Sequence, residues 1–151
     1  MLRPSKKMLF AIEAVLDIAY HAGGEPVQSR EITRRQGIPR RYLEQTLQQL
    51  VRSGILTGVR GPRGGYRLAR ERRRVTVGEI VRVVRALEAA EETPEEVPNS
   101  ELGLQVIRPL WVVMQDELMH KLDAISIDDL CMKAYQTGIV SEVTQKMDFT
   151  I

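Results

Sequence analysis

The 151-residue sequence has one cysteine, few aromatic residues and no long apolar run. Its single cysteine, Cys131, excludes an internal disulfide framework and agrees with a reducing compartment. No transmembrane helix is predicted, because that would need about 18 consecutive apolar residues. The apolar N-terminal segment could be mistaken for a secretion signal, but Glu13 and Asp17 interrupt it at helical spacing. We therefore expect a cytoplasmic protein without a membrane partner.

The sequence also lacks the residue patterns of common active sites and metal sites. Its two histidines, His21 and His120, are isolated, and no Ser/His/Asp set or metal-ligand spacing stands out. The glycine-rich stretch GVRGPRGGYRLAR, residues 58–70, matches neither the phosphate-binding loop ending in Gly-Lys-Ser/Thr nor the dinucleotide fingerprint. We therefore predict no enzyme activity, no metal site and no cofactor.

What the sequence does contain is an uneven distribution of charge. Residues 1–74 hold 16 Lys and Arg against 6 Asp and Glu, whereas residues 75–151 hold 6 against 14. The first half therefore carries a net charge of +10 and the second half −8, which together give the overall +2. A strongly basic half indicates a surface that faces a polyanion such as double-stranded DNA. The alternative is that the arginines only solvate helix faces.

The pattern of helices in the basic half predicts a helix-turn-helix. Apolar residues recur at helical spacing in segments 6–22 and 40–53, and a shorter helix fits 30–36, with Ser29 as its N-cap. The short connection 37–39 joins the second and third helices. Two strand candidates, ILTGVR and GGYRLAR, then flank the turn sequence GPRG. The predicted fold is mainly α with a small β-hairpin, a winged helix-turn-helix domain.

Beyond the hairpin, the sequence predicts an appendage built on a long helix. Thr76 and Glu79 form a capping box that begins the helix after the wing. The acidic segment 88–101 has six glutamates and two prolines, which indicates a loop or linker. We expect a DNA-binding domain at 1–87, this linker, a dimerisation helix and a short C-terminal helix at 102–135, and a loosely ordered tail at 136–151.

The long helix carries an apolar stripe that is wider than packing within one chain requires. Self-association along it is the favoured reading, and packing within the monomer is the alternative. The residues expected at the dimer interface are Ile107, Leu110, Trp111, Met114, Leu118, Leu122 and Ile125.

Three stretches together resemble the Rrf-type family of bacterial winged-helix regulators: RRYLEQTLQQLVRSGILTGVRGPRGGYRLAR, VTVGEIVRVV and LWVVMQDELMHKLDAISIDDL. The similarity covers roughly residues 5–133. It implies a homodimeric transcription factor with a winged DNA-binding domain and one long dimerisation helix from each subunit. In sensing members of this family, three cysteines before the dimerisation helix help to ligate an iron–sulfur cluster. The matching segment here, residues 88–105, has none, and Cys131 lies outside it.

We therefore predict a family member without a cluster, and the signal that it answers to stays open. A small molecule bound between the post-wing helix and the long helix, or a partner protein, would fit as effector. Oxidation of Cys131 is a further alternative, although its place on an apolar helix face favours a buried structural thiol.

The residues expected to contact DNA fall into two groups. Arg41 and Glu44 share the outward face of the recognition helix, where arginine pairs with guanine and glutamate accepts from cytosine. The alternative for Glu44 is a salt bridge to Arg40 or Arg41. The base-reading candidates are Arg41, Glu44, Arg40 and Gln45. The candidates for backbone or minor-groove contact are Ser29, Arg30, Tyr42, Gln48, Arg60, Gly61, Arg63, Gly64 and Gly65.

These observations predict a sequence-specific DNA-binding regulator that acts as a homodimer on a palindromic operator, with repression as the expected output. The alternative from a different class is a winged-helix adaptor or regulatory subunit that binds protein. Binding to random duplex DNA with a steep salt dependence would separate the two.

Overall fold

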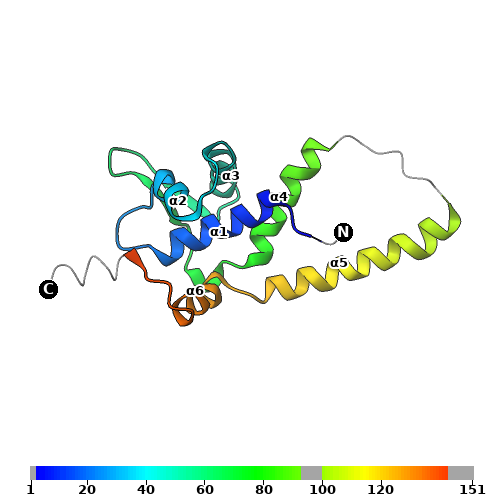
Figure 1. Cartoon of the computed structure of the whole chain (residues 1–151). Helices are drawn as coiled ribbons and strands as arrows, with labels where there is room; N and C mark the ends of the chain where they lie inside the picture. Colours follow the sequence, from blue (N-terminus) through cyan, green and yellow to red (C-terminus); the bar gives the residue numbers. More distant parts are fainter. Residues whose placement is uncertain (1–2, 93–99, 143–151) are drawn as a thin grey trace.

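The computed structural model describes residues 3–92 and 100–142 (Figure 1). It confirms the predicted mainly helical fold with one antiparallel hairpin, the wing of a winged helix-turn-helix. The elements are α1 (Lys6–Tyr20), α2 (Ser29–Gln36), α3 (Arg40–Arg52), β1 (Leu56–Val59), β2 (Gly65–Leu68), α4 (Val77–Glu91), α5 (Arg108–Asp123) and α6 (Ile127–Gln136). No helix in the described residues is long and apolar enough to cross a membrane.

Helix α1 runs through the middle of the molecule, and α2, α3, β2, α4 and α6 pack against it (Figure 1). Its inner face is fully buried against the leucines of α3, which follow the predicted helical spacing. Val51, an apolar residue near the end of the helical pattern predicted for 40–53, is only half-buried. Thr46 is buried instead, because its hydroxyl donates to the Tyr42 carbonyl at 2.8 Å and so needs no water. The core side chains of α1 and α3 are Ala11, Ala14, Val15, Ile18, Leu43, Leu47 and Leu50.

The helix starts follow side-chain caps, and one of them differs from the expectation. Thr76 and Glu79 form the predicted capping box of α4, with the Glu79 N–H donating to the Thr76 hydroxyl at 3.2 Å. In α2, however, Ser29 is the first helical residue and Gln28 occupies the N-cap. The carboxylate of Glu31 accepts from the Gln28 backbone N–H at 2.9 Å, so Glu31 closes this helix start in place of the expected Ser29 cap.

The wing is a short hairpin that is also tied to the chain before α2. Leu56 pairs with Leu68 and Val59 with Gly65. Val27 and Tyr66 exchange two backbone hydrogen bonds of 2.9 and 2.8 Å, which adds a bridge on the outer edge of β2. The wing is therefore fixed to the segment that leads into α2.

The second half of the chain departs from the expected boundaries at two places. Helix α4 continues to Glu91, so residues 88–91 of the expected linker are helical. Residues 137–142 of the expected loose tail are also ordered: Ser141 and Glu142 contact α1 and α2. Residues 93–99 and 143–151 of these two segments lie outside the described residues.

Helix α5 projects away from the rest of the chain and meets it only near its C-terminal end (Figure 1). Helical structure begins at Glu101 and passes through a π-helical turn, Gly103–Ile107, before α5 itself. Pro109 lies in the first turn of α5, as its missing N–H favours. At the other end, the Val77 N–H donates to the Ile125 carbonyl and the Ile127 N–H to the Val75 carbonyl, at 2.9 and 2.8 Å. These bonds fix the base of α5 to the start of α4.

Candidate nucleic-acid interface

An open groove of about 930 Å³ lies between α2, α3 and the wing. Ser29 and Arg30 reach it from the first turn of α2, and Arg40 from the first turn of α3. The amides at the start of a helix and arginine side chains both favour a phosphate, so the groove combines two kinds of anion contact. Seven of the residues predicted to contact DNA line it: Ser29, Arg30, Arg40, Arg60, Gly61, Gly64 and Gly65.

The outward face of α3 carries a ridge of exposed polar side chains. Arg41, Glu44 and Gln48 follow at spacings of three and four residues and are all exposed, opposite the buried leucines. The helix is held by its inner face alone, so this ridge is free to enter a major groove. The predicted base-reading pair Arg41 and Glu44 thus lies on one accessible face.

The salt bridge considered for Glu44 is present in the DNA-free structure. Its Oε1 atom lies 2.9 Å from Nε of Arg40, and both side chains are more than half exposed. An ion pair so open to solvent contributes little to stability, because water screens it. It can therefore break when a base edge or a phosphate offers a better partner.

Tyr42 and Gln45 lie on a different flank of α3 from the wing groove. Both side chains face α1 and α4, where they line a small space with Lys7 and Glu91. The Tyr42 ring also lies 6.5 Å from the ring of Phe10, in a tilted arrangement. The structure thus gives Tyr42 a packing partner on α1, although its side chain is still 41% exposed.

The wing glycines have two different physical roles. Gly61 has φ of +110°, with open space around its Cα, as a glycine at an exposed turn tip requires. A Cβ on Gly64 would lie 2.2 Å from the Val59 carbonyl oxygen, and one on Gly65 would lie 2.4 Å from that of Val27. Glycine is therefore required at 64 and 65 by close contacts with the backbone of the wing and of the segment before α2.

Several groove residues were not predicted from the sequence. Gln28 and Thr33 join it from α2, and the Gln28 side chain donates to the Pro62 carbonyl at 3.3 Å, across to the wing. Thr33 stands three residues after Arg30, so helical spacing from Ser29 and Arg30 could have identified it. Gln28 could not have been found in this way, because its position depends on the contact with the wing. The unpredicted lining residues are Gln28, Thr33, Val51, Gly58, Val59, Pro62 and Tyr66.

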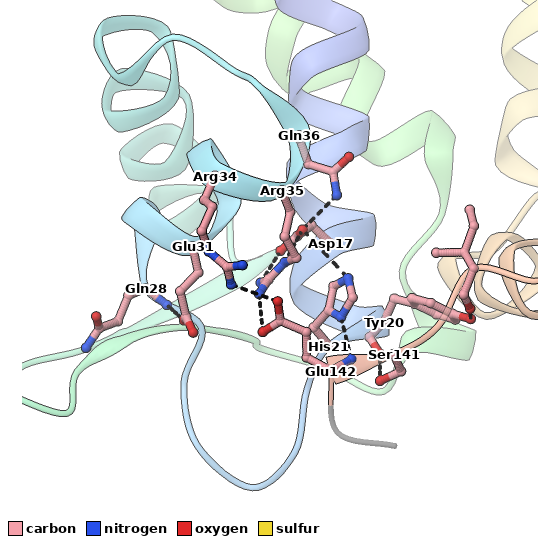
Figure 2. Close-up of polar contacts among 11 residues, drawn as sticks. Asp17, Tyr20, His21, Gln28, Glu31, Arg34, Arg35, Gln36, Ser141 and Glu142 are labelled. Carbon is pink, nitrogen blue, oxygen red and sulfur yellow. Dashed lines mark hydrogen bonds and ion pairs between the residues drawn. The ribbon is translucent and has the colours of Figure 1, made fainter. Parts of the chain in front are cut away.

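A buried ion pair holds the C-terminal end of α2 against α1 (Figure 2). Arg35 donates from Nε and Nη2 to the two carboxylate oxygens of Asp17, each at 2.8 Å. Gln36 donates to the same carboxylate, also at 2.8 Å. Asp17 is 2% exposed and was not predicted to be a buried residue. Its contacts help to set the angle at which α2 presents its first turn to the groove.

Helix α5 offers a second candidate surface, which is apolar. Five of the seven residues predicted to lie in a dimer interface are about half exposed: Ile107, Leu110, Trp111, Met114 and Leu118. Leu122 and Ile125 are half-buried at the base of the helix, where α5 meets the DNA-binding domain. An apolar surface that covers a projecting helix is typical of a protein–protein interface.

The residues of this chain do not fit an iron–sulfur cluster. Such clusters need several thiolates, and the segment between α4 and α5 contains no cysteine. Cys131 is buried on α6 and is 3% exposed. Burial raises the pKa of the Cys131 thiol, so the thiolate that a metal requires is disfavoured there. The described residues also contain no group of three or more His, Cys, Asp or Glu side chains arranged to hold a metal ion.

Residues 4–133 match the Rrf2 family, described as "Iron-dependent Transcriptional regulator". Among curated proteins, the chain is 32% identical to "Protein rrf2" of Nitratidesulfovibrio vulgaris over 126 residues, which cover 83% of this chain and 84% of that one. It is 33% identical to "HTH-type transcriptional regulator IscR" of Xenorhabdus nematophila over 131 residues, covering 85% and 79% of the two chains.

Solved structures agree with this assignment. The protein described as "T. potens IscR" aligns with a TM-score of 0.72 at 32% identity, covering 93% of each chain. CymR, the "Global Cysteine Regulator of B. subtilis", aligns with a TM-score of 0.68 at 28% identity, covering 88% of this chain and 98% of that one. The matched segment spans the groove, the recognition helix and α5, and this chain belongs to the Rrf2 family of helix-turn-helix transcriptional regulators, which are not enzymes.

Proposed function

We propose that this Rrf2-family regulator is a homodimer that binds a palindromic operator and represses transcription without an iron–sulfur cluster. The observation that carries the proposal is the groove in which the starts of α2 and α3 meet the wing. It brings Ser29 and Arg30, at the start of α2, together with Arg60 of the wing, about 30 residues further along the chain, and all three are suited to phosphate. The same residue types on an adaptor that binds protein would have no reason to converge there.

In this proposal, Arg41 and Glu44 read base edges in the major groove, with Arg40 and Gln45 as further candidates. The backbone and the adjacent minor groove are contacted by α2, by α3 and by the wing. The residues assigned to these contacts are Ser29, Arg30, Tyr42, Gln48, Arg60, Gly61, Arg63, Gly64 and Gly65. For Gly64 and Gly65 the contact would be made by the backbone.

Dimerisation is supported by the exposed apolar side chains of α5. Leu110, Met114 and Leu118 are between 46% and 57% exposed, and burying them against a second copy would remove that surface from water. A two-fold dimer presents two recognition helices related by symmetry, so it selects an operator with the same symmetry. A dimer bound to such an operator would repress by occupying the promoter.

The absence of a cluster is supported by the lack of cysteine in residues 88–105 and by the burial of Cys131. A small molecule or a partner protein is then the effector. Protein purified under anaerobic conditions should lack an absorbance band near about 400 nm and stoichiometric iron and sulfide. Finding all three would overturn this part of the proposal.

The DNA-binding part is tested with the full chain and a fluorescent duplex of random sequence. Fluorescence anisotropy should show binding. The logarithm of the association constant should fall linearly with the logarithm of the salt concentration between about 50 and 200 mM, because phosphates that bind protein release counterions. No binding at the lowest salt, or affinity independent of salt, would contradict DNA binding and favour the protein-binding alternative.

A further inference from the structure

After α6 the chain returns to α1 and α2 and contacts both helices (Figure 2). Residues 139–142, called here the C-terminal strap, lie against the end of α1. The Tyr20 hydroxyl donates to the Ile139 carbonyl, and the Ser141 hydroxyl donates to the Tyr20 carbonyl at 3.0 Å. The strap is therefore fixed to α1 by a side-chain bond from each partner.

The last described residue of the strap, Glu142, joins it to α2. One carboxylate oxygen lies 2.7 Å from Nη2 of Arg34, and the other lies 2.8 Å from Nη1 of Arg35. The Arg35 side chain is 10% exposed and that of Glu142 is 24% exposed. Since solvent screens this pair less than an open surface pair, it contributes more to local stability than a surface ion pair does.

His21 contacts the backbone of Glu142. The N–H of Glu142 donates to Nδ1 of His21 at 3.1 Å, so this nitrogen must be unprotonated. The groups that face His21 are Asp17, with Oδ2 4.0 Å from Nε2, and Glu142, Arg34 and Arg35. Burial, followed by the charge of Arg35, lowers the pKa of His21, against the opposing effect of the two carboxylates. The neutral imidazole that accepts this bond is thus the favoured form at neutral pH.

Helix α2 depends on such polar contacts because it has little apolar packing. It is eight residues long, and Ile32 is its only buried residue. Its first turn lines the DNA groove, whereas Arg34 and Arg35, near its other end, do not line it. The N-terminal end of α2 thus lines the groove, whereas its C-terminal end contacts Asp17 and the strap.

We propose that the C-terminal strap holds α2 in the position from which its first turn contacts DNA phosphates, with Glu142 as the positioning residue. This inference rests on the proposed DNA binding. Glu142 does not touch DNA in this scheme, since it is not part of the groove and acts only through Arg34 and Arg35. The opposite reading is that Glu142 lowers DNA affinity by neutralising those two cations.

The test compares the full-length wild type with Glu142→Gln, and uses Glu13→Gln as the matched control. Glu13 is exposed on α1 and makes no ion pair within the described residues, so it undergoes the same charge change without the contact. In Glu142→Gln, the amides of residues 29–36 should exchange with deuterium about three- to tenfold faster, because α2 opens locally more often. Affinity for a random-sequence duplex should fall about two- to fivefold, as the binding-competent population decreases.

The control should match the wild type in both measurements. Unchanged exchange in α2, or unchanged affinity, would overturn the proposal. Tighter binding with a salt slope steeper by about one would also overturn it, because that result means that Glu142 masks a cation. If the wild type binds no DNA, the proposed function fails, while the exchange measurement still decides whether Glu142 holds α2.

A pH series distinguishes positioning of the strap by His21 from a general structural role of this residue. His21→Asn keeps an acceptor oxygen near the position of Nδ1 but does not titrate. Between about pH 8 and pH 5.5, the protection factors of the α2 amides, which correct for the pH dependence of intrinsic exchange, should fall more in the wild type than in His21→Asn, because protonation removes the acceptor for Glu142. Equal pH profiles for the two proteins would show that His21 does not hold the strap.

Discussion

The carboxylate of Asp17 accepts hydrogen bonds from Nε and Nη2 of Arg35, each at 2.8 Å, in a position that solvent does not reach. This pair joins α1, the central helix of the core, to α2, the first helix of the helix-turn-helix. Ile32 is the only residue that α2 buries. The Asp17–Arg35 pair and the polar contacts beside it therefore determine the position of α2 against α1. The geometry of the groove between α2, α3 and the wing therefore depends on a buried charge.

Removing that charge should destabilise the fold. In Asp17→Asn, Arg35 keeps only Glu142 as an anionic partner, and the free energy of unfolding should fall by about 2–4 kcal/mol. Urea denaturation followed by circular dichroism measures the change. Glu13→Gln, on the exposed side of α1, should change the same quantity by less than about 0.5 kcal/mol. A loss below about 1 kcal/mol in Asp17→Asn would mean that the pair contributes little.

Stability should also depend on the protonation of His21. Its pKa in the folded protein is lowered by burial and by Arg35, so on acidification the unfolded chain takes up this proton first. The stabilisation is fully present above the unfolded pKa of about 6.5 and is lost as pH falls through the folded pKa. Urea denaturation from pH 8 downward should therefore show a larger loss in the wild type than in His21→Asn. If the free energy of unfolding fell in parallel with pH in the two proteins, this prediction would be contradicted.

Substitutions on the ridge of α3 should change which sequence is preferred. Arg41→Ala and Glu44→Ala should each relax base preference at one operator position, at a cost of about 1–3 kcal/mol for the preferred base. Selection of bound duplexes by each variant, compared with the wild type, measures this. Arg52→Ala, at the C-terminal end of the same helix, is the control. If Glu44→Ala retained full affinity and the same preferred sequence, Glu44 would not read a base.

A wing arginine should act on all sequences alike. Arg63 is exposed in the loop between β1 and β2, where it can contact the backbone or an A·T-rich minor groove. Arg63→Ala should weaken binding evenly and lower the salt slope by about one, measured by anisotropy. Arg85→Ala removes an equally exposed charge on α4 and should leave the slope unchanged. A similar slope for the wild type and Arg63→Ala would place Arg63 away from phosphates.

A charge on the apolar face of α5 should disrupt the dimer. Leu118→Glu and Leu110→Glu place a carboxylate on half-exposed positions, so a dimer would have to bury it. Sedimentation should give twice the 17.2 kDa chain mass for the wild type and the single chain mass for these variants. Met132→Glu changes an equally exposed apolar residue on α6 and should remain dimeric. A monomeric wild type at micromolar concentration would contradict dimerisation through this helix.

The sequence was sufficient where local chemistry decides the structure. Caps such as Thr76 with Glu79 and the leucine spacing of α3 are short-range patterns, and they gave the correct elements. Asp17 could not be recognised in this way, because its helical spacing fits an exposed face as well. Its burial depends on Arg35 and Gln36 arriving from another helix.

The strap and the wing glycines show the same limit. Residues 137–142 have no periodicity, and their position depends on Tyr20, His21, Arg34 and Arg35. Gly64 and Gly65 were expected to contact DNA from their place in a glycine- and arginine-rich stretch, and the sequence did not show that they also lie tightly against the backbone carbonyls of Val59 and Val27. Contacts between distant segments thus account for what the sequence did not reveal.

Selection of bound duplexes from a random pool by the full-length wild type tests the central claim most directly. A homodimer that reads bases through α3 should enrich an inverted repeat, with half-site centres about 10–10.5 base pairs apart or a multiple of that spacing. Enrichment of no sequence, or of a site without two-fold symmetry, would contradict a symmetric dimer that reads DNA through Arg41 and Glu44.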